Sequence, residues 1–378
     1  MQTTQSCPDN LPEVAEYIAT SAALDALCAR LEHSDFFALD TEFIRERTYL
    51  PRLCLLQVAA PALLAIVDPI ALPDLEPLWR LLQQHSIIKV LHSGRQDLEV
   101  LYEHCGIVMA PLFDTQLAAT LLGHGDQLGY GALVEARCGV TLDKAYTRTD
   151  WAARPLEPGP LRYAADDVRY LVPLYQQMRQ QLEQDGRLHW LTEDCASLAN
   201  PASYGTLPED AWKRVRGAQS LRGRARQSLR QLAAWRERQA RAEDRPRRWV
   251  VADELLVELA KHSPPDVEHL QRIRGMEAGV AHRYGHELLA LLRTEGPVLP
   301  TFDPPASRHL LTVEQNNLVE SLLAVVTEEC TAHRVAVATL TSRRDLEALV
   351  LQRADIPLLH GWRRALAGQR VLDILKSG

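Results

Sequence analysis

The hydrophobic pattern changes near the middle of this chain, and the change constrains the fold more than any other sequence feature. Over the first 200 residues, short apolar runs alternate with helical periodicity at 75–84 and 96–104. We expect strands at the apolar runs 36–39, 53–58, 63–67 and 87–91. Strands interleaved with helices predict an α/β domain. The close spacing of the first three runs suggests an antiparallel meander, and therefore a mixed sheet.

Beyond residue 200 the sequence predicts helices and no convincing strand. A breaker-rich stretch at 200–208 reads as a linker, and a second one at 296–305 divides the helical half. Helical periodicity dominates five segments: 229–241, 252–262, 280–292, 312–330 and 344–351. We therefore expect three domains, an α/β domain over 1–200 and two small helical bundles over 205–295 and 300–378.

Composition excludes several classes of protein. The chain of 378 residues is 46% hydrophobic and 24% charged, as in ordinary globular proteins. It contains no apolar run long enough for a transmembrane helix and no signal-peptide pattern at its start. Its seven cysteines are odd in number and lack a CxxC pair, which argues against a disulfide framework and a cysteine zinc site. We expect a cytoplasmic protein with no membrane partner.

Charge is spread unevenly, and this suggests a polyanionic partner. The net charge is −7, but residues 212–249 hold thirteen Lys and Arg against three acids, a local charge of +10 that leaves −17 elsewhere. Arginine suits phosphate contact through its fork of donors. Four arginines are candidates for such contact: Arg222, Arg224, Arg226 and Arg230. The alternative interpretation is a solvated basic helix.

Two acids close the first apolar run. Residues two apart on a strand share a face, so Asp40 and Glu42 present their carboxylates side by side. Carboxylates placed this way repel each other and are costly to desolvate. A hard divalent cation, Mg²⁺ or Mn²⁺, is the usual remedy. The alternative is a strand that runs out into a polar turn.

Further acids stand at helix positions. Asp97 would occupy the first turn of a helix, where a carboxylate is favoured by the helix dipole, and Asp114 suits an N-cap. Tyr163 and Asp167 are four apart and share a helix face. A phenol and a carboxylate placed this way could together bind a water molecule and a metal ion. Asp166 is three from the tyrosine, and spacing alone leaves the choice between the two acids open.

Together these acids resemble the DEDD exonuclease superfamily, in its tyrosine-bearing branch, and within it the ribonuclease D family. The family spaces its tyrosine and last aspartate four apart, which selects Asp167. The resemblance covers about residues 20–195 in order, including these segments: 38–43, 47–49, 55–57, 92–94, 113–116, 142–144, 149–151, 154–156 and 163–165. It implies an RNase H-like domain with a mixed, mostly five-stranded sheet.

The resemblance also implies an active 3′→5′ exonuclease that releases 5′-mononucleotides with two divalent metal ions. Asp40 is then the bridging ligand. Glu42 and Asp167 hold the metal that activates water, and Asp97 supports the second metal. Tyr163 positions or deprotonates the attacking water, and its ordinary pKa near 10 makes positioning at least as plausible as base catalysis.

Several neighbours are candidates for substrate contact. Phe43 could stack on a terminal base, and Thr41 lies between the two strand acids. Four arginines could meet backbone phosphates, with packing or surface roles as the alternative: Arg45, Arg47, Arg148 and Arg154. His92 reads as a structural histidine, because the four acids already complete a hard-metal site.

The helical half resembles HRDC domains, small bundles shared by RecQ helicases and ribonuclease D. The similar segments are 235–256, 270–275 and 283–289, and we infer a second, divergent HRDC-like domain near the end of the chain. The expected partner is RNA, with tRNA precursors and single-stranded 3′ ends as substrates of a monomer. The alternatives are a 3′→5′ DNA exonuclease on the same chemistry and a non-catalytic nucleic-acid-binding adaptor. The intact set of acids argues against the adaptor.

Overall fold

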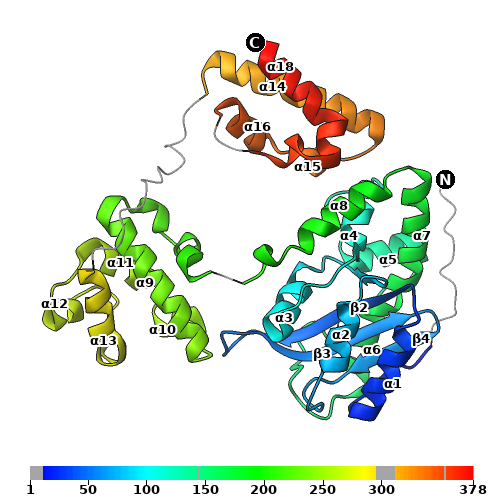
Figure 1. Cartoon of the computed structure of the whole chain (residues 1–378), viewed down its shortest axis with the longest axis horizontal. Helices are drawn as coiled ribbons and strands as arrows, with labels where there is room; N and C mark the ends of the chain where they lie inside the picture. Colours follow the sequence, from blue (N-terminus) through cyan, green and yellow to red (C-terminus); the bar gives the residue numbers. More distant parts are fainter. Residues whose placement is uncertain (1–11, 144, 206, 295–310, 353–354, 378) are drawn as a thin grey trace. The chain divides into compact units, whose positions relative to one another are not determined.

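The computed structural model describes residues 12–143, 145–205, 207–294, 311–352 and 355–377 (Figure 1). By their contacts, these residues fall into two compact units. The first unit contains the described residues up to 43 together with 53–203 and the segment after 310. The second unit contains 44–52 and the described residues from 204 to 294. No helix in the described part of the chain is long and apolar enough to cross a membrane.

A six-stranded mixed sheet forms the centre of the first unit, with strand order β1-β4-β3-β2-β5-β6. The strands are β1 (Glu16–Ile18), β2 (Phe36–Ile44), β3 (Arg52–Ala60), β4 (Leu63–Val67), β5 (Ile88–Leu91) and β6 (Leu112–Asp114). Strands β3 and β4 pair antiparallel, whereas β1 pairs parallel with β4, and β5 pairs parallel with both β2 and β6. The expected α/β domain with a mixed sheet is confirmed.

The sheet differs from the sequence-based expectation at its edges and in one central strand. The edge strands β1 and β6 have three residues each, too few to show an alternating pattern. Strand β2 continues to Ile44, so Asp40 and Glu42 lie inside a strand and not at its end. The apolar run ends at Leu39, so sequence periodicity does not reveal that the strand continues.

Helices cover both faces of this sheet, as the burial of every residue of β3 from Leu53 to Ala60 shows. They are α1 (Ser21–Leu31), α2 (Glu76–Leu82), α3 (Arg95–Cys105), α4 (Thr115–Leu121), α5 (Tyr130–Cys138), α6 (Pro158–Arg169), α7 (Leu171–Gln184) and α8 (Leu188–Leu198). Helix α6 packs on β4, α7 packs on β5 and α8 packs on β6. Their packing places the acids of α6 near the central strands.

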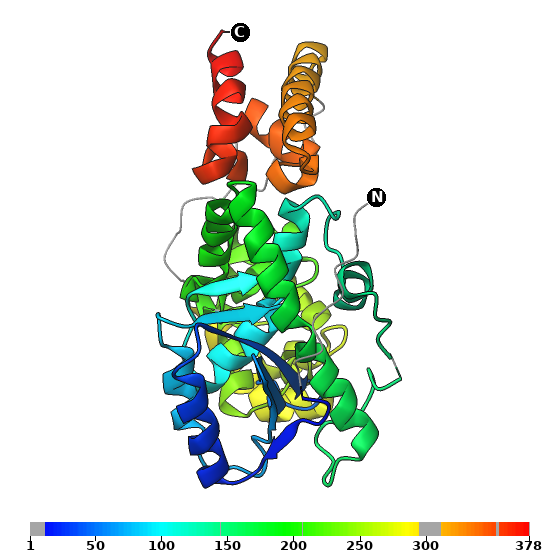
Figure 2. The same cartoon turned by 90° about the vertical axis from the view of Figure 1, so that its right-hand side faces the viewer.

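The segment after residue 310 is helical and belongs to the same unit. Its helices are α14 (Val313–His333), α15 (Val337–Leu340), α16 (Arg343–Val350), α17 (Gly361–Arg363) and α18 (Gln369–Ser377), and α14 and α18 lie side by side (Figures 1 and 2). The Trp362 ring stacks on Trp190 of α8 with centroids 4.6 Å apart, and Arg363 pairs with Asp194 at 2.5 Å. The expected breaker stretch at 296–305 lies outside the described residues.

The second unit is an all-helical bundle. Its helices are α9 (Gly223–Ala242), α10 (Arg247–Val250), α11 (Asp253–His262), α12 (Val267–Gln271) and α13 (Ala278–Arg293), preceded by the 3₁₀ turns η2 (Pro208–Arg214) and η3 (Ala218–Ser220). Leu229 and Leu232 of α9, Leu256 of α11 and Leu288 of α13 are fully buried in its core. Tyr49, from the loop between β2 and β3, is part of the same core.

Candidate active site

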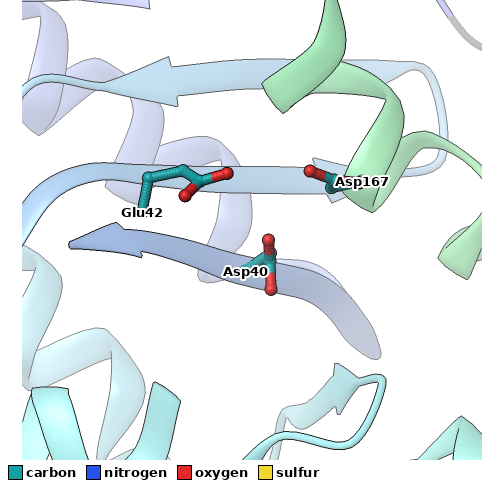
Figure 3. A group of neighbouring side chains, drawn as sticks. All are labelled: Asp40, Glu42 and Asp167. Atoms are coloured by element: carbon teal, nitrogen blue, oxygen red, sulfur yellow. The ribbon is translucent and has the colours of Figure 1, made fainter. Parts of the chain in front are cut away.

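Three carboxylates from two elements meet at one place in the first unit. Asp40 and Glu42 are two apart on β2 and share a face of the strand, and Asp167 comes from the last turns of α6. Each offers an oxygen that lies within 4.8 Å of those of the other two, and all three side chains are half-buried. Figure 3 shows the three carboxylates pointing toward one another.

Asp97 lies in the first turn of α3 and is hydrogen-bonded to β2 at Thr41, the residue between Asp40 and Glu42. Its side chain is 8% exposed, and its Oδ1 accepts a hydrogen bond of 2.5 Å from the hydroxyl of Thr41. Thr41 is itself buried, at 5% exposure. The structure thus places the Thr41 side chain against Asp97, where it orients a carboxylate.

Asp114 fixes the start of the helix that carries Asp97. Its side chain caps α4, as the sequence suggests, by accepting from two backbone N–H groups of the first turn. The same carboxylate also accepts from the N–H groups of Ser93 and Gly94 at 3.1 and 2.9 Å, just before α3. A side chain on Gly94 would approach Leu91 within 2.8 Å, so this turn requires glycine. The second pair of bonds is not visible from sequence, because it joins two separate turns.

The acids share an unfavourable electrostatic environment. Burial, followed by the charges of Asp97, Asp167 and Glu42, raises the pKa of Asp40 well above its usual value. Burial and the neighbouring charges also raise the pKa of Glu42 to about 8 and that of Asp167 to about 7. The pKa of Asp97 rises to about 6, mainly through burial. These are the shifts expected of like charges held together in a poorly solvated place.

A hard divalent cation fits this set of donors. The cluster offers oxygen ligands only, which select Mg²⁺ or Mn²⁺ over softer metals. A cation would also relieve the repulsion that raises the pKa values of the three acids. Asp40, Glu42 and Asp167 are placed to hold it directly.

Tyr163 lies one helical turn before Asp167, and two aromatic side chains hold its ring. Trp151 stacks against it with centroids 6.2 Å apart and a 29° angle between the rings, and Tyr146 meets it edge-on at 6.3 Å. Trp151 is 4% exposed. Burial and the charge of Asp167 raise the pKa of Tyr163 above its ordinary value, so its hydroxyl stays protonated near neutral pH.

Sequence reasoning did not assign roles to Trp151 and Tyr146. Both come from the irregular segment between α5 and α6, where hydrophobic periodicity gives no information. The available signal was that Trp151 lies in one of the segments that resemble ribonuclease D. In the structure, Trp151 of that segment packs against the Tyr163 ring.

Asp166 and Asp167 have different surroundings. The Asp166 carboxylate accepts from Nε of Arg169 at 2.7 Å, and its backbone oxygen accepts from the hydroxyl of Tyr130 at 2.9 Å. Asp167 points into the carboxylate cluster instead. The geometry thus favours the same aspartate as the family spacing.

One candidate phosphate contact is a structural arginine. The Arg154 guanidinium forms a two-pronged pair with the buried Asp68 at 2.7 Å on each arm and donates to the carbonyl oxygen of Cys54 at 2.8 Å. Burial would raise the pKa of Asp68, but its hydrogen bonds hold the pKa below the usual value. The geometry therefore favours the packing role, the alternative given for Arg154, because partners within the fold use its donors.

The other substrate candidates lie in varied surroundings. Arg45, Arg47 and Arg148 are exposed, and Phe43 is half-buried.

The Nδ1 atom of His92 lies 2.9 Å from the Thr115 hydroxyl, in keeping with the interpretation of His92 as a structural histidine.

The four arginines of α9 and its cap belong to the second unit. Arg222 donates to the Leu221 carbonyl at 2.9 Å, and Arg226 donates to the same oxygen at 3.0 Å. The guanidinium of Arg230 lies 5.5 Å from the centre of the Trp212 ring. Arg222 and Arg224 are exposed, whereas Arg226 and Arg230 are half-buried.

A mixed sheet that carries two acids on one strand, with a tyrosine and a third acid on a late helix, defines a metal-dependent exonuclease domain, and the comparisons agree. The 3'-5' exonuclease family model matches residues 15–183, and the HRDC domain model matches 225–292. The chain is 41% identical to ribonuclease D of Acidiphilium cryptum over 368 residues, covering 96% of this chain and 93% of that protein. It is 40% identical to ribonuclease D of Granulibacter bethesdensis, covering 96% and 92%.

A solved structure shows the same similarity. Escherichia coli RNase D superposes with a TM-score of 0.83 at 33% identity, covering 96% of this chain and 99% of that one. The chain belongs to the ribonuclease D family. It is accordingly a 3′→5′ exoribonuclease that depends on a divalent metal and acts on RNA.

Replacing Asp167 by Asn should lower turnover by at least about a hundredfold, since even the outer partners of metal ligands are worth ~10–100-fold. Replacing Asp166 by Asn breaks a partly exposed ion pair with Arg169 and removes a charge that raises the pKa of Asp167, but no ligand of the cluster, and should cost less than about tenfold. Single-turnover hydrolysis of a short RNA by the two folded variants measures this. A larger loss in Asp166→Asn would contradict the site.

The metal-free protein should become less stable as pH rises from about 4 to 8. The folded-state pKa values of Glu42 and Asp167 are raised above their unfolded values, so their protonated forms stabilise the fold below pH 4 and this contribution is lost through pH 7–8. Asp40→Asn should raise the melting temperature in EDTA at pH 8, by about 2–4 °C per kcal/mol of relieved repulsion.

Calorimetry at pH 5 and pH 8, with EDTA or with Mn²⁺, checks this expectation. Mn²⁺ should raise the melting temperature of the wild type at pH 8 and leave that of Asp40→Asn nearly unchanged. An equal rise in both proteins would show that the metal binds elsewhere.

Proposed function

We propose that this protein trims the 3′ ends of structured RNAs, tRNA precursors among them, and releases 5′-mononucleotides one at a time. The observation that carries the proposal is the cluster of Asp40, Glu42 and Asp167, with oxygens within 4.8 Å of one another. Escherichia coli RNase D, a relative of known structure, is described as an exoribonuclease involved in structured RNA processing. All three acids come from one chain, so the site needs no second copy, and we propose a monomer.

The proposal includes two divalent ions, Mg²⁺ or Mn²⁺. Asp40 would contact both ions, Glu42 and Asp167 would hold one of them, and Asp97 would support the other. When bound, such ions neutralise the phosphate, activate a water and stabilise the leaving 3′ oxygen. The hydrogen bond from Thr41 holds the Asp97 carboxylate in place for this task.

Tyr163 is proposed to position the attacking water. Its raised pKa keeps the phenol protonated near neutral pH, so the hydroxyl acts through hydrogen bonds and not as a free base. Trp151 and Tyr146 contact the Tyr163 ring and restrict its orientation, one helical turn before Asp167. This arrangement favours positioning over base catalysis, the two roles that the sequence leaves open.

The helical second unit is proposed to bind the body of the RNA. Arg222, Arg224, Arg226 and Arg230 all lie in the first half of α9 or at its cap, which gathers positive charge at one end of a helix. Phe43 follows Glu42 directly on β2 and is proposed to stack on the terminal base. Binding of the RNA body and hydrolysis at its end would then use different parts of the chain.

Hydrolysis of labelled single strands tests the proposed direction and substrate. With Mg²⁺ or Mn²⁺, RNA labelled at its 3′ end should release labelled mononucleotide at once, whereas RNA labelled at its 5′ end should shorten stepwise. EDTA should stop both reactions, and Asp40→Asn serves as the inactive control. Internal fragments, activity in EDTA or a preference for DNA of the same sequence would contradict the proposal.

Replacing the four arginines by Gln should weaken binding of long RNA and flatten its salt dependence. Each phosphate contact that is lost should lower the log–log salt slope by roughly 0.7. Cleavage of a very short oligonucleotide should change little. Binding titrations at several salt concentrations measure the slope, and an unchanged slope with unchanged affinity would show that these side chains serve only the fold of the second unit.

A further inference from the structure

The loop that follows the catalytic strand is built into the helical second unit. Residues 44–52 group with the helices after 204, although they connect β2 to β3. Ile44, the last residue of β2, is therefore only two positions from Glu42 and already belongs to the helical unit. The loop includes 47–49, a segment that resembles ribonuclease D and has no role in the function proposed above.

Tyr49 anchors this loop through its side chain. It is 6% exposed within the core of the helical unit, and its hydroxyl donates to Glu237 of α9 at 2.6 Å. Glu237 is 2% exposed and forms a two-pronged pair with Arg247, both contacts being 2.6 Å. The Arg247 guanidinium also lies 4.5 Å from the centre of the Tyr49 ring, a cation–π distance. The buried Glu237 carboxylate, its half-exposed partner Arg247 and the burial of the Tyr49 ring therefore hold one loop residue.

Asp244 anchors the same loop through its backbone. This residue follows the end of α9 with φ of 46°, in the left-handed region. Its Oδ1 accepts from the backbone N–H groups of Tyr49 and Leu50, at 3.0 and 3.2 Å. Two consecutive amides of the loop thus share one carboxylate oxygen. The loop is fixed both at a side chain and along its main chain.

We propose that Tyr49 and Asp244 are positioning residues for hydrolysis, because together they fix the end of β2 that carries Glu42. The HRDC-like unit then has a second task besides binding RNA, which is to hold the strand of the catalytic acids in place. This inference rests on the carboxylate cluster being the site of hydrolysis. A misplacement of reacting groups by about 1 Å can cost on the order of 10²-fold in rate. Contacts that fix the position of Glu42 would therefore preserve turnover.

Two substitutions at Asp244 distinguish the loss of its hydrogen bonds to the loop from a disturbance of the end of α9. Asn and Gly both suit a left-handed residue after a helix, but only Asn keeps an oxygen that accepts from the two loop amides. Glu287→Ala is a control in the same unit, because it removes a 2.7 Å hydrogen bond to Trp235 and none of the contacts with Tyr49 and Leu50 described above. Tyr49→Phe removes only the hydroxyl and keeps the ring.

The readouts are turnover of a dinucleotide, Mn²⁺ affinity and hydrogen exchange of the peptide 36–44, all on the full chain. Asp244→Gly should lower kcat on the dinucleotide by roughly tenfold with little change in KM. It should also weaken Mn²⁺ binding and speed exchange at the end of β2. Asp244→Asn and Glu287→Ala should resemble the wild type in all three, and Tyr49→Phe should fall between.

The inference is overturned if Asp244→Gly matches Asp244→Asn in turnover, Mn²⁺ affinity and exchange, or if Glu287→Ala reproduces its defects. The first outcome would show that the anchor does not reach the catalytic strand. The second would show general loosening of the helical unit. Failure of the wild type to cleave the dinucleotide would count against the proposed function alone, because hydrogen exchange at 36–44 still tests the anchor.

Discussion

Repulsion among closely spaced, half-buried carboxylates is the constraint on which the rest of this structure depends. Asp40, Glu42 and Asp167 are held with their oxygens within 4.8 Å, in surroundings that raise the pKa of each. Without a cation this arrangement opposes folding. Rigid elements must therefore hold it, and a central strand together with a packed helix supplies that rigidity. The same carboxylates that destabilise the metal-free fold would bind the cation, and such a conflict between stability and function is common at functional sites.

Supporting contacts hold several of the site residues in place. Thr41 holds Asp97, Asp114 ties the turn before α3 to the start of α4, and Trp151 restricts Tyr163. Within the helical unit, Asp244 binds the loop that continues from β2. We expect single substitutions among these supporting residues to weaken the site in steps.

The sequence predicts the chemistry of this protein better than the contacts between its distant segments. Asp40 and Glu42 are recognisable because a two-residue spacing on an apolar strand has one geometric meaning, and 63–67 is a strand as expected. The choice of Asp167 over Asp166 needed the family spacing, and the structure adds the reason, since Arg169 binds the other acid. Local spacing suffices where the relevant geometry lies within one element.

Contacts between distant segments were not predictable in this way. The sequence left a phosphate contact and a packing role open for Arg154, because an exposed arginine and a buried one look alike in sequence and its partner Asp68 lies 86 positions away. The burial of Tyr49 among helices more than 150 residues later, and the stacking of Trp190 on Trp362, have the same origin. The edge strands were missed for another reason, since three residues carry no period.

The most direct measurement is the anomalous scattering of Mn²⁺ in crystals of the wild type and of Asp40→Asn. The account predicts a peak among the carboxylates of Asp40, Glu42 and Asp167 in the wild type. It predicts loss of that peak in the variant, with the three side-chain positions otherwise kept. Manganese bound only elsewhere in the wild type, or an equal peak among the carboxylates in the variant, would contradict the account.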